Sequence, residues 1–162
     1  MKVLLSESQR LVVGTFNGKV AEFGLSDLRP CDSTVGDSHS AVFSDTVLAY
    51  EFGETMDRVI LLASNHFGDF EVSQLSNDCS TVVGSNKEVN SSPIGSFAIN
   101  PLSKLTFAAG DNDGYLKVWE LSGDGHLALR SEKREAHQSQ VLKVAWTSAS
   151  ELFTVGFDDS FK

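Results

Sequence analysis

Acidic and histidine side chains are the first candidates for chemistry in this chain of 162 residues. The run Gly-Asp-Asn-Asp-Gly at residues 110–114, with Glu120 beyond it, has the residue types of part of a calcium-binding loop. We expect a hairpin turn instead, because the first ligand position would be Ala109 and the following residues have the pattern of a strand. The histidines lie at no metal-ligand spacing. We therefore expect no metal and no cofactor at His39, His66, His126 or His137.

Motifs for catalysis are missing from the sequence. Nucleophilic catalysis needs a nucleophile, a base and an orienting group that converge in space. The chain has no nucleophile elbow, no phosphate-binding glycine loop and no paired-carboxylate motif. Cys31 and Cys79 are too few for a zinc site and have no CxxC spacing, which favours reduced thiols in a cytoplasmic or nuclear protein. We predict that the protein is not an enzyme.

The composition is that of an acidic globular protein. Hydrophobic residues make up 41% of the chain, and its 11 Phe suit a β-rich core. The formal net charge of −9 argues against a nucleic-acid surface, which requires clusters of Lys and Arg. No apolar run approaches the length of a membrane span. We therefore expect protein or peptide partners, and neither nucleic acid nor membrane.

The elements that must position these side chains repeat along the chain. Residues 105–121 contain two apolar runs that are joined by an Asn-Asp-Gly turn, and the second run includes Val-Trp-Glu. The turn positions of four such units are separated by 50, 46 and 46 residues; they are Gly18, Gly68, Gly114 and Ser160. A fixed period in the forties, built of short strands, is the signature of a propeller blade.

Local residues explain the turns and the strands. Asn17-Gly18 and Asp113-Gly114 are dipeptides that tolerate positive φ in a tight hairpin. The runs before the turns are short and nearly continuously apolar, as expected of a strand buried on both faces; they read LVVGTF, ILLASNH, LTFAAGD and LFTVGFD. A long amphipathic helix would explain none of these features. The sequence therefore predicts an all-β fold.

At these residues the chain resembles the WD40 family. The third unit is the best match, with Gly110, Asp113 and Trp119 at the family's spacing of Gly, turn Asp and strand Trp. The match is weakest over residues 47–75, where Phe67 replaces the turn Asp and Ser73 replaces the Trp.

The fourth unit carries a further part of the resemblance. Ala136-His137 stands where the family commonly has Gly-His, and Gly156 and Asp159 follow; His39 is the candidate for the equivalent histidine of the second unit. The third and fourth units are also similar to the closing blades of cytosolic propellers such as actin-interacting protein 1, although no more closely than to the family in general.

In the WD40 family, a His–Ser/Thr–Asp–Trp hydrogen-bond network often braces each blade. The resemblance assigns structural roles of this kind to His137, Asp113, Trp119 and Asp159. No unit holds all four members, because Ala109 and Val155 occupy the Ser/Thr place. We therefore expect the blades to depend more on apolar packing than on buried polar networks.

The resemblance implies four antiparallel strands in each blade. The chain is then expected to be a WD40-like β-propeller, a partial ring of three full four-stranded blades plus half of a fourth, over residues 1–36, 46–84, 94–131 and 140–162. Such an arc exposes an apolar flank and an unpaired strand edge. We expect either the missing blades of a longer protein or another polypeptide to complete the ring. A closed four-bladed ring fits less well, because the last blade lacks its outer half.

In the family, the turns between the second and third strands of each blade gather on one face around the channel mouth. Here those turns place aromatic residues beside polar and acidic ones; they are Phe16, His66, Phe67, Asp111, Asn112, Phe157 and Asp158. Exposed Phe is unfavourable unless it is covered. We therefore hypothesise a contact patch for a protein or peptide, whose acidic residues favour a basic partner. The alternative is that each Phe folds back onto its own hairpin or the next blade.

Two functions are compatible with these sequence features. The first is a noncatalytic interaction scaffold of the cytoplasm or nucleus, which binds protein or peptide partners on its loop face. The second is a structural subunit of a larger complex, whose incomplete propeller is closed by another chain through strand pairing.

Overall fold

The computed structural model describes residues 10–14, 20–24, 47–54, 59–75, 80–87, 92–103 and 105–162. Within these ranges every regular element is a β-strand. The strands are β1 (Arg10–Gly14), β2 (Val20–Gly24), β3 (Val47–Glu54), β4 (Val59–Asn65), β5 (Phe70–Leu75), β6 (Ser80–Asn86), β7 (Ile94–Ile99), β8 (Thr106–Asp111), β9 (Leu116–Leu121), β10 (Leu127–Lys133), β11 (Val141–Trp146) and β12 (Leu152–Gly156). No helix with the length and apolar character needed to cross a membrane occurs in the described part of the chain.

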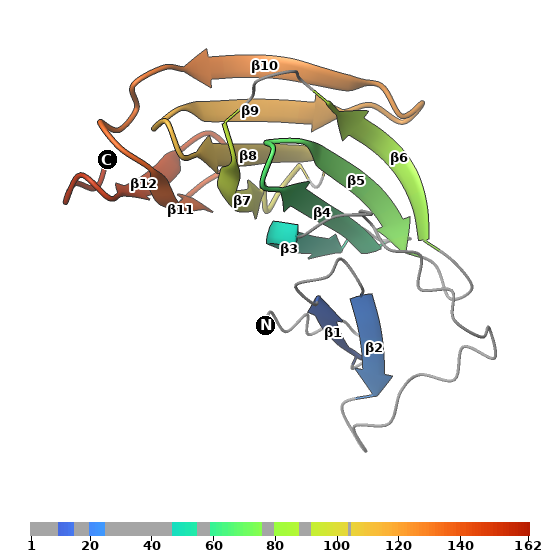
Figure 1. Ribbon diagram of the computed structural model, residues 1–162. Helices are drawn as coiled ribbons and strands as arrows, with labels where there is room; N and C mark the ends of the chain where they lie inside the picture. Colours follow the sequence, from blue (N-terminus) through green and yellow to red (C-terminus); the bar gives the residue numbers. More distant parts are fainter. Residues whose placement is uncertain are drawn as a thin grey trace.

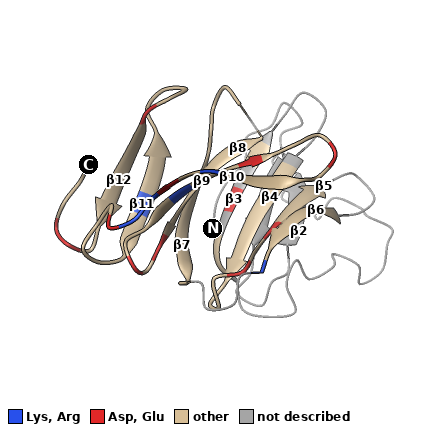
Figure 2. Ribbon diagram, turned by 90° about the horizontal axis from the view of Figure 1, so that it is seen from above, with Lys and Arg blue, Asp and Glu red and all other residues tan. Residues whose placement is uncertain are grey.

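The described strands form four antiparallel sheets that follow one another in chain order (Figure 1). Strands β3 to β6 make one four-stranded meander and β7 to β10 make a second, while β1 with β2 and β11 with β12 form two hairpins. Seen from above, the sheets succeed one another like the segments of a fan (Figure 2). This arrangement confirms the predicted partial propeller.

The first strand of each described meander lies at the inner side of the arc. Strands β3 and β7 contact each other across neighbouring sheets, and β7 likewise contacts β11. Strands β6 and β10 stand at the opposite edges of their sheets, because each meander runs outward in sequence order. Because consecutive strands are antiparallel, the second strand of each meander ends at the same end of its sheet at which the third strand begins.

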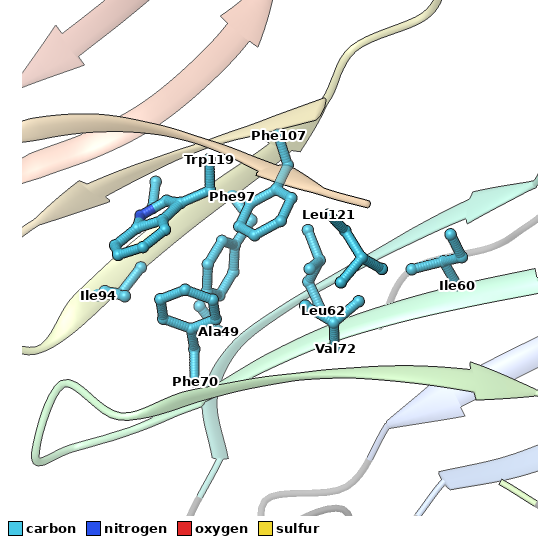
Figure 3. Close-up of a cluster of buried hydrophobic side chains, with 11 residues drawn as sticks. Ala49, Ile60, Leu62, Phe70, Val72, Ile94, Phe97, Phe107, Trp119 and Leu121 are labelled. Atoms are coloured by element: carbon cyan, nitrogen blue, oxygen red, sulfur yellow. The ribbon is translucent and has the colours of Figure 1, made fainter. Parts of the chain in front are cut away.

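The largest core fills the space between the β3–β6 sheet and the β7–β10 sheet (Figure 3). Phe70 contacts three aromatic rings edge-on, with centroid separations of 5.9 Å to Phe97, 5.7 Å to Phe107 and 5.4 Å to Trp119. Edge-to-face rings at such distances add to the stabilisation that burial alone provides. The buried members of this core are Ala49, Ile60, Leu62, Phe70, Val72, Ile94, Phe97, Phe107, Ala109, Trp119 and Leu121.

A second core joins the β7–β10 sheet to the β11–β12 hairpin. Its buried members are small, namely Ala98, Ala108, Val141 and Val144. Trp146 packs against this group, and its Nε1–H donates to the carbonyl of Ala98 at 3.0 Å. The small residues let the two sheets approach closely, and the indole hydrogen bond ties their inner strands together.

Candidate functional site

Three hairpin turns and one connector lie at the same end of the sheets (Figure 1). Residues 66–68 join β4 to β5, residues 112–114 join β8 to β9, and residues 157–159 follow β12. Residues 134–140 connect β10 to β11 and reach the same end, because His137 N–H donates to the carbonyl of Gly114 at 3.0 Å. We call this end the loop face. The strand pairs that bracket the three turns are Ser64 with Phe70, Gly110 with Leu116, and Val155 with Phe161.

Two phenylalanines are exposed at these turns. Phe67 is 58% exposed and Phe157 is 69% exposed, so more than half of the surface of each residue is accessible to solvent. The ring of Phe67 lies against His66, with a centroid separation of 3.9 Å. Asn112, in the turn between them, is also exposed. The loop face therefore carries aromatic surface on two of its turns.

Two acidic residues that we predicted as surface contacts have structural roles instead. Asp111 is buried, and its Oδ1 accepts hydrogen bonds from Asp113 N–H at 3.0 Å and Tyr115 N–H at 2.8 Å. Asp158 accepts from Gln138 N–H at 2.9 Å and from the Ser160 hydroxyl at 2.7 Å. Both carboxylates are thus engaged in holding their turns, and neither is a simple exposed charge.

A buried histidine forms the centre of the polar network in the last described sheet. His137 is 1% exposed. Its Nε2 lies 2.8 Å from the hydroxyl of Thr154, while its Nδ1 lies 2.9 Å from Asp158 Oδ1 and 3.1 Å from the hydroxyl of Ser160. The side chain therefore joins the connector from β10, strand β12 and the turn after it. This agrees with the structural role that the sequence predicted for His137.

The register corrects two assignments in this network. Val155 bridges to Phe161 as Gly110 pairs with Leu116, so Asp158 is the equivalent of Asp113. Each equivalent residue in the last sheet therefore lies one position earlier in the chain than predicted. Asp158, not Asp159, is the carboxylate that contacts His137. Likewise Thr154, not Val155, occupies the Ser/Thr place and supplies a hydroxyl.

Asp159 has a backbone role. Its φ is 56°, in the left-handed region, and it stands where the two preceding turns have Gly68 (φ 87°) and Gly114 (φ 84°). Asp is among the few side chains that adopt this conformation readily. The sequence prediction was displaced by one residue because the turn lacks the glycine that marks the other two.

The third sheet holds only part of the equivalent network. Asp113 is exposed at the turn, and its backbone N–H donates to Asp111. Trp119 is 6% exposed, and its Nε1–H has no hydrogen-bond acceptor among the described residues. Ala109 stands at the register position that Thr154 holds in the last sheet, as predicted, and it offers no oxygen to the indole.

Asn65 is a turn residue that the sequence analysis missed. Its Oδ1 accepts from Phe67 N–H at 2.9 Å and from Asp69 N–H at 3.1 Å, the same two-bond pattern that Asp111 forms. This pattern fixes the backbone that presents Phe67. The available signal was an Asn or Asp directly after the apolar run of the second strand, since both side chains favour such local turns.

Several acidic side chains are exposed at the loop face. Asp113, Glu135 and Asp159 are exposed there, while Arg134 of the connector is paired with Glu132 at 3.1 Å. Burial raises the pKa of Asp111. The N–H of Gln138 and the hydroxyl of Ser160 hold the pKa of Asp158 well below its usual range. Asp158 is therefore charged at neutral pH.

Some predicted features lie outside the described residues. Phe16 and His39 are among them, so the aromatic surface of the first turn and the histidine of the second unit stay predictions. Within the described ranges, no group of three or more His, Cys, Asp or Glu side chains is arranged to hold a metal ion.

Comparisons with known proteins support the fold. The crystal structure of Chaetomium thermophilum Sqt1 bound to the N-terminus of the ribosomal protein L10 aligns with a TM-score of 0.68 and 20% identity, over 93% of this chain and 42% of that one. The crystal structure of the mitotic checkpoint complex aligns with a TM-score of 0.67 and 18% identity, over 95% of this chain and 44% of that one. No family model and no curated protein matches the sequence.

These alignments show a fold of the WD40 propeller type. This chain spans less than half the length of either matching chain. The finer similarity to the closing blades of actin-interacting protein 1 stays a prediction.

Proposed function

We propose that this chain is a noncatalytic interaction scaffold of the cytoplasm or nucleus, and that its loop face binds a protein or peptide partner. The observation that carries the proposal is the exposure of Phe67 and Phe157 at two turns of that face. Aromatic side chains that protrude from rigid turns are typical interface anchors, because binding removes a large apolar area from water at a small cost in side-chain entropy.

The turns that present these rings are held in place before binding. Asn65 fixes the backbone of the first turn, and the bonds between Asp158, Ser160 and His137 fix the last one. Preorganisation of this kind lowers the entropy cost of binding. A fold neighbour, Sqt1, was crystallised with the N-terminus of a ribosomal protein, which supports the use of such a scaffold for peptide binding.

The charge of the face favours a basic partner. Asp113, Glu135 and Asp159 are exposed on the turns and connector of the loop face, and the whole chain has a formal net charge of −9. Complementary charge steers a partner toward the face and adds specificity more than affinity. We therefore propose a peptide segment that combines Lys or Arg with an apolar residue for the aromatic turns.

The test uses immobilised peptides of one length in which an apolar residue is flanked by Lys and Arg, by Asp and Glu, or by Ser. We expect the basic series to bind most tightly, and Phe67→Ser or Phe157→Ser to weaken that binding by about tenfold or more. Leu102→Ser is the matched control, because Leu102 is 78% exposed in the β7–β8 turn, at the opposite end of its sheet.

Thermal unfolding of the same variants separates binding from folding. Phe67→Ser and Phe157→Ser remove exposed rings, so we expect the melting temperature to change little. A large drop in melting temperature, or equal loss of binding for Leu102→Ser, would contradict the proposal and favour a purely structural role for the two rings.

A second candidate function rests on a different surface. On the β11–β12 hairpin, Leu142 and Phe153 are exposed, and the ring of Phe161, which is 74% exposed, lies 5.7 Å from that of Phe153. Apolar side chains gathered on one sheet are typical of a surface that another element covers. This supports a structural subunit whose propeller is completed by a further sheet from another polypeptide.

Light scattering coupled to size-exclusion chromatography tests this second candidate. An apolar surface of this kind promotes association, so we expect the mean mass of the chain to rise across a concentration series. Replacing Leu142 and Phe153 by Glu is expected to suppress the rise, whereas Leu102→Glu is not. A constant monomer mass at all concentrations would count against this role.

A further inference from the structure

A small cavity lies between the β3–β6 and β7–β10 sheets, close to the loop face. Gly68 of the first described turn lines it, and so do Phe70 and Ile94, which lie beside the Trp119 indole in Figure 3. Its polar lining comes from Asn86, Ser92, Asp111, Lys117 and Trp119. The cavity is thus neither purely apolar nor large.

The Trp119 indole presents an unsatisfied donor in this region. Its side chain is more than nine-tenths buried, and Nε1–H has no acceptor among the described residues. Leaving such a donor without any partner costs its full desolvation free energy, so native proteins rarely do so. The other indole of the chain, on Trp146, donates to the carbonyl of Ala98 at 3.0 Å.

The origin of the unsatisfied donor lies in one side chain. Phe107 pairs with Trp119 across β8 and β9, which places Ala109 diagonally beside the indole on the same face. At the equivalent position of β12, Thr154 carries a hydroxyl that bonds to His137. Ala109 has no such oxygen, and its smaller side chain leaves space where a hydroxyl would otherwise lie.

We propose that this cavity is a binding site for a single ordered water molecule, which accepts a hydrogen bond from Trp119 Nε1–H and replaces the missing hydroxyl at position 109. The cavity offers about 10 Å³ to the centres of water-sized molecules, close to the space that one water requires. Buried waters also need two to four polar partners. Besides Trp119, the polar residues Asp111 and Ser92 line the site.

The space available to a water-sized molecule is close to that of one water, so the site is matched to water or to a group of the same size. Burial raises the pKa of Asp111, which agrees with a carboxylate that is largely removed from bulk solvent at the edge of the cavity.

Nuclear magnetic resonance of the ¹⁵N-labelled chain tests the proposal directly. The sequence has two Trp, so its spectrum contains two indole N–H signals. We expect a rotating-frame cross-peak to water at the Trp119 indole proton and a much weaker or absent one at Trp146, whose donor is bonded to protein. A missing cross-peak at Trp119, or equal cross-peaks at both indoles, would overturn the proposal.

Two variants identify the source of the cross-peak. Ala109→Val fills the cavity with methyl groups, so the cross-peak at Trp119 should disappear while the Trp146 signal stays in place. Ala149→Val adds the same two methyl groups at an exposed position away from the cavity and should leave the cross-peak unchanged. A cross-peak that persists in Ala109→Val, or that is lost in Ala149→Val, would overturn the assignment to a water bound in this cavity. The comparison of the two indoles in the unsubstituted chain tests the proposal even if Ala109→Val fails to fold.

Discussion

At the scale of single residues, one position on the strand before each loop-face turn decides whether a hydroxyl is available for a buried hydrogen bond. In β12 the position holds Thr154, whose hydroxyl lies 2.8 Å from His137 Nε2. In β8 it holds Ala109, and in β4 it holds Ala63, which is buried. Among the described sheets, the network around His137 is therefore confined to β11–β12, while the two larger sheets meet through apolar packing and a buried hydrogen bond from Ser64 Oγ to the carbonyl of Ile94 at 3.1 Å.

The first prediction concerns Thr154. Thr154→Val keeps the shape of the side chain but leaves the Nε2 of the buried His137 without its partner. Burial of an unsatisfied polar group costs about 1–3 kcal/mol, and we expect the free energy of unfolding in urea to fall by that amount. Thr147→Val is the control, because its hydroxyl is exposed and bonds to the carbonyl of Glu151. Equal losses for both variants would contradict the role of the network.

The second prediction is the dependence of stability on pH through Asp158. Its pKa is lowered in the folded chain, chiefly by the N–H of Gln138 and the Ser160 hydroxyl. Its stabilising contribution is therefore present above the unfolded pKa, about 3.9, and is lost as pH falls through the lower folded value. We expect Asp158→Asn to lose less stability than the wild type below about pH 4.

The comparison with Asp159→Asn isolates this effect. Asp159 is exposed in the same turn and makes no hydrogen bond to His137. Unfolding of the three proteins in urea at a series of pH values should show the flatter acid limb in Asp158→Asn alone. The same flattening in Asp159→Asn would mean that general charge, and not the bonded carboxylate, causes the pH dependence.

Residue-level roles could be predicted from the sequence only where the turn marker was clear. The structural role predicted for His137 agrees with its hydrogen bonds, and Ala-His is recognisable at its spacing. Trp119 is buried, but its indole takes no part in the predicted network, because Nε1–H has no acceptor among the described residues. The carboxylate and hydroxyl positions of the last unit were predicted one residue too late, at Asp159 and Val155 instead of Asp158 and Thr154. The reason is that Asp159 takes the left-handed conformation that Gly68 and Gly114 take in the other turns. The unsatisfied Trp119 donor could not be inferred from the sequence, because it depends on which side chains reach the indole.

At the scale of elements, the turns of the loop face are fixed by their backbone. The β8–β9 turn contacts the β10–β11 connector closely, since the carbonyl of Gly114 accepts from His137 N–H at 3.0 Å. Strand positions were predictable because the short apolar runs are bounded by Asn, Asp and Gly. The bulge between Leu129 and Ser131 was not predictable, because it depends on pairing with β9.

The third prediction tests this close contact. In Gly114→Ala, the new Cβ would lie 2.2 Å from the carbonyl oxygen of His137, and the φ of +84° disfavours any L side chain. The combined steric and conformational cost predicts a loss of about 2–4 kcal/mol in the free energy of unfolding. Gly123→Ala is the matched control, because nothing lies within 4 Å of its added Cβ, and a change within about 0.5 kcal/mol is expected.

Binding and stability measurements together make this prediction sharper. The β8–β9 turn belongs to the loop face, so Gly114→Ala should also weaken peptide binding if the turn must be preorganised. A variant that unfolds at the wild-type denaturant concentration would show that the connector moves aside easily, and that the contact does not restrain the turn.

At the scale of the whole molecule, the sheets are coupled by the side chains between them. The repeat period predicted the fan of sheets, because side-by-side blades bury apolar strands on both faces. The period could not indicate which residues carry the coupling. The structure assigns that role to the aromatic cluster in which Phe70 of the β3–β6 sheet meets Phe97, Phe107 and Trp119 of the β7–β10 sheet.

The fourth prediction is that Phe70→Ala destabilises both four-stranded sheets together. Phe70 is 1% exposed, and removal of a buried Phe costs about 3–5 kcal/mol. Because its ring contacts the neighbouring sheet as well as its own, amide hydrogen exchange should accelerate in β4 and β5 and equally in β8 and β9. Phe67→Ala, three residues away on the exposed turn, should leave exchange in both sheets nearly unchanged. Faster exchange in β4 and β5 alone would mean that each sheet opens independently, and that the aromatic cluster fills space between the sheets without coupling their stability.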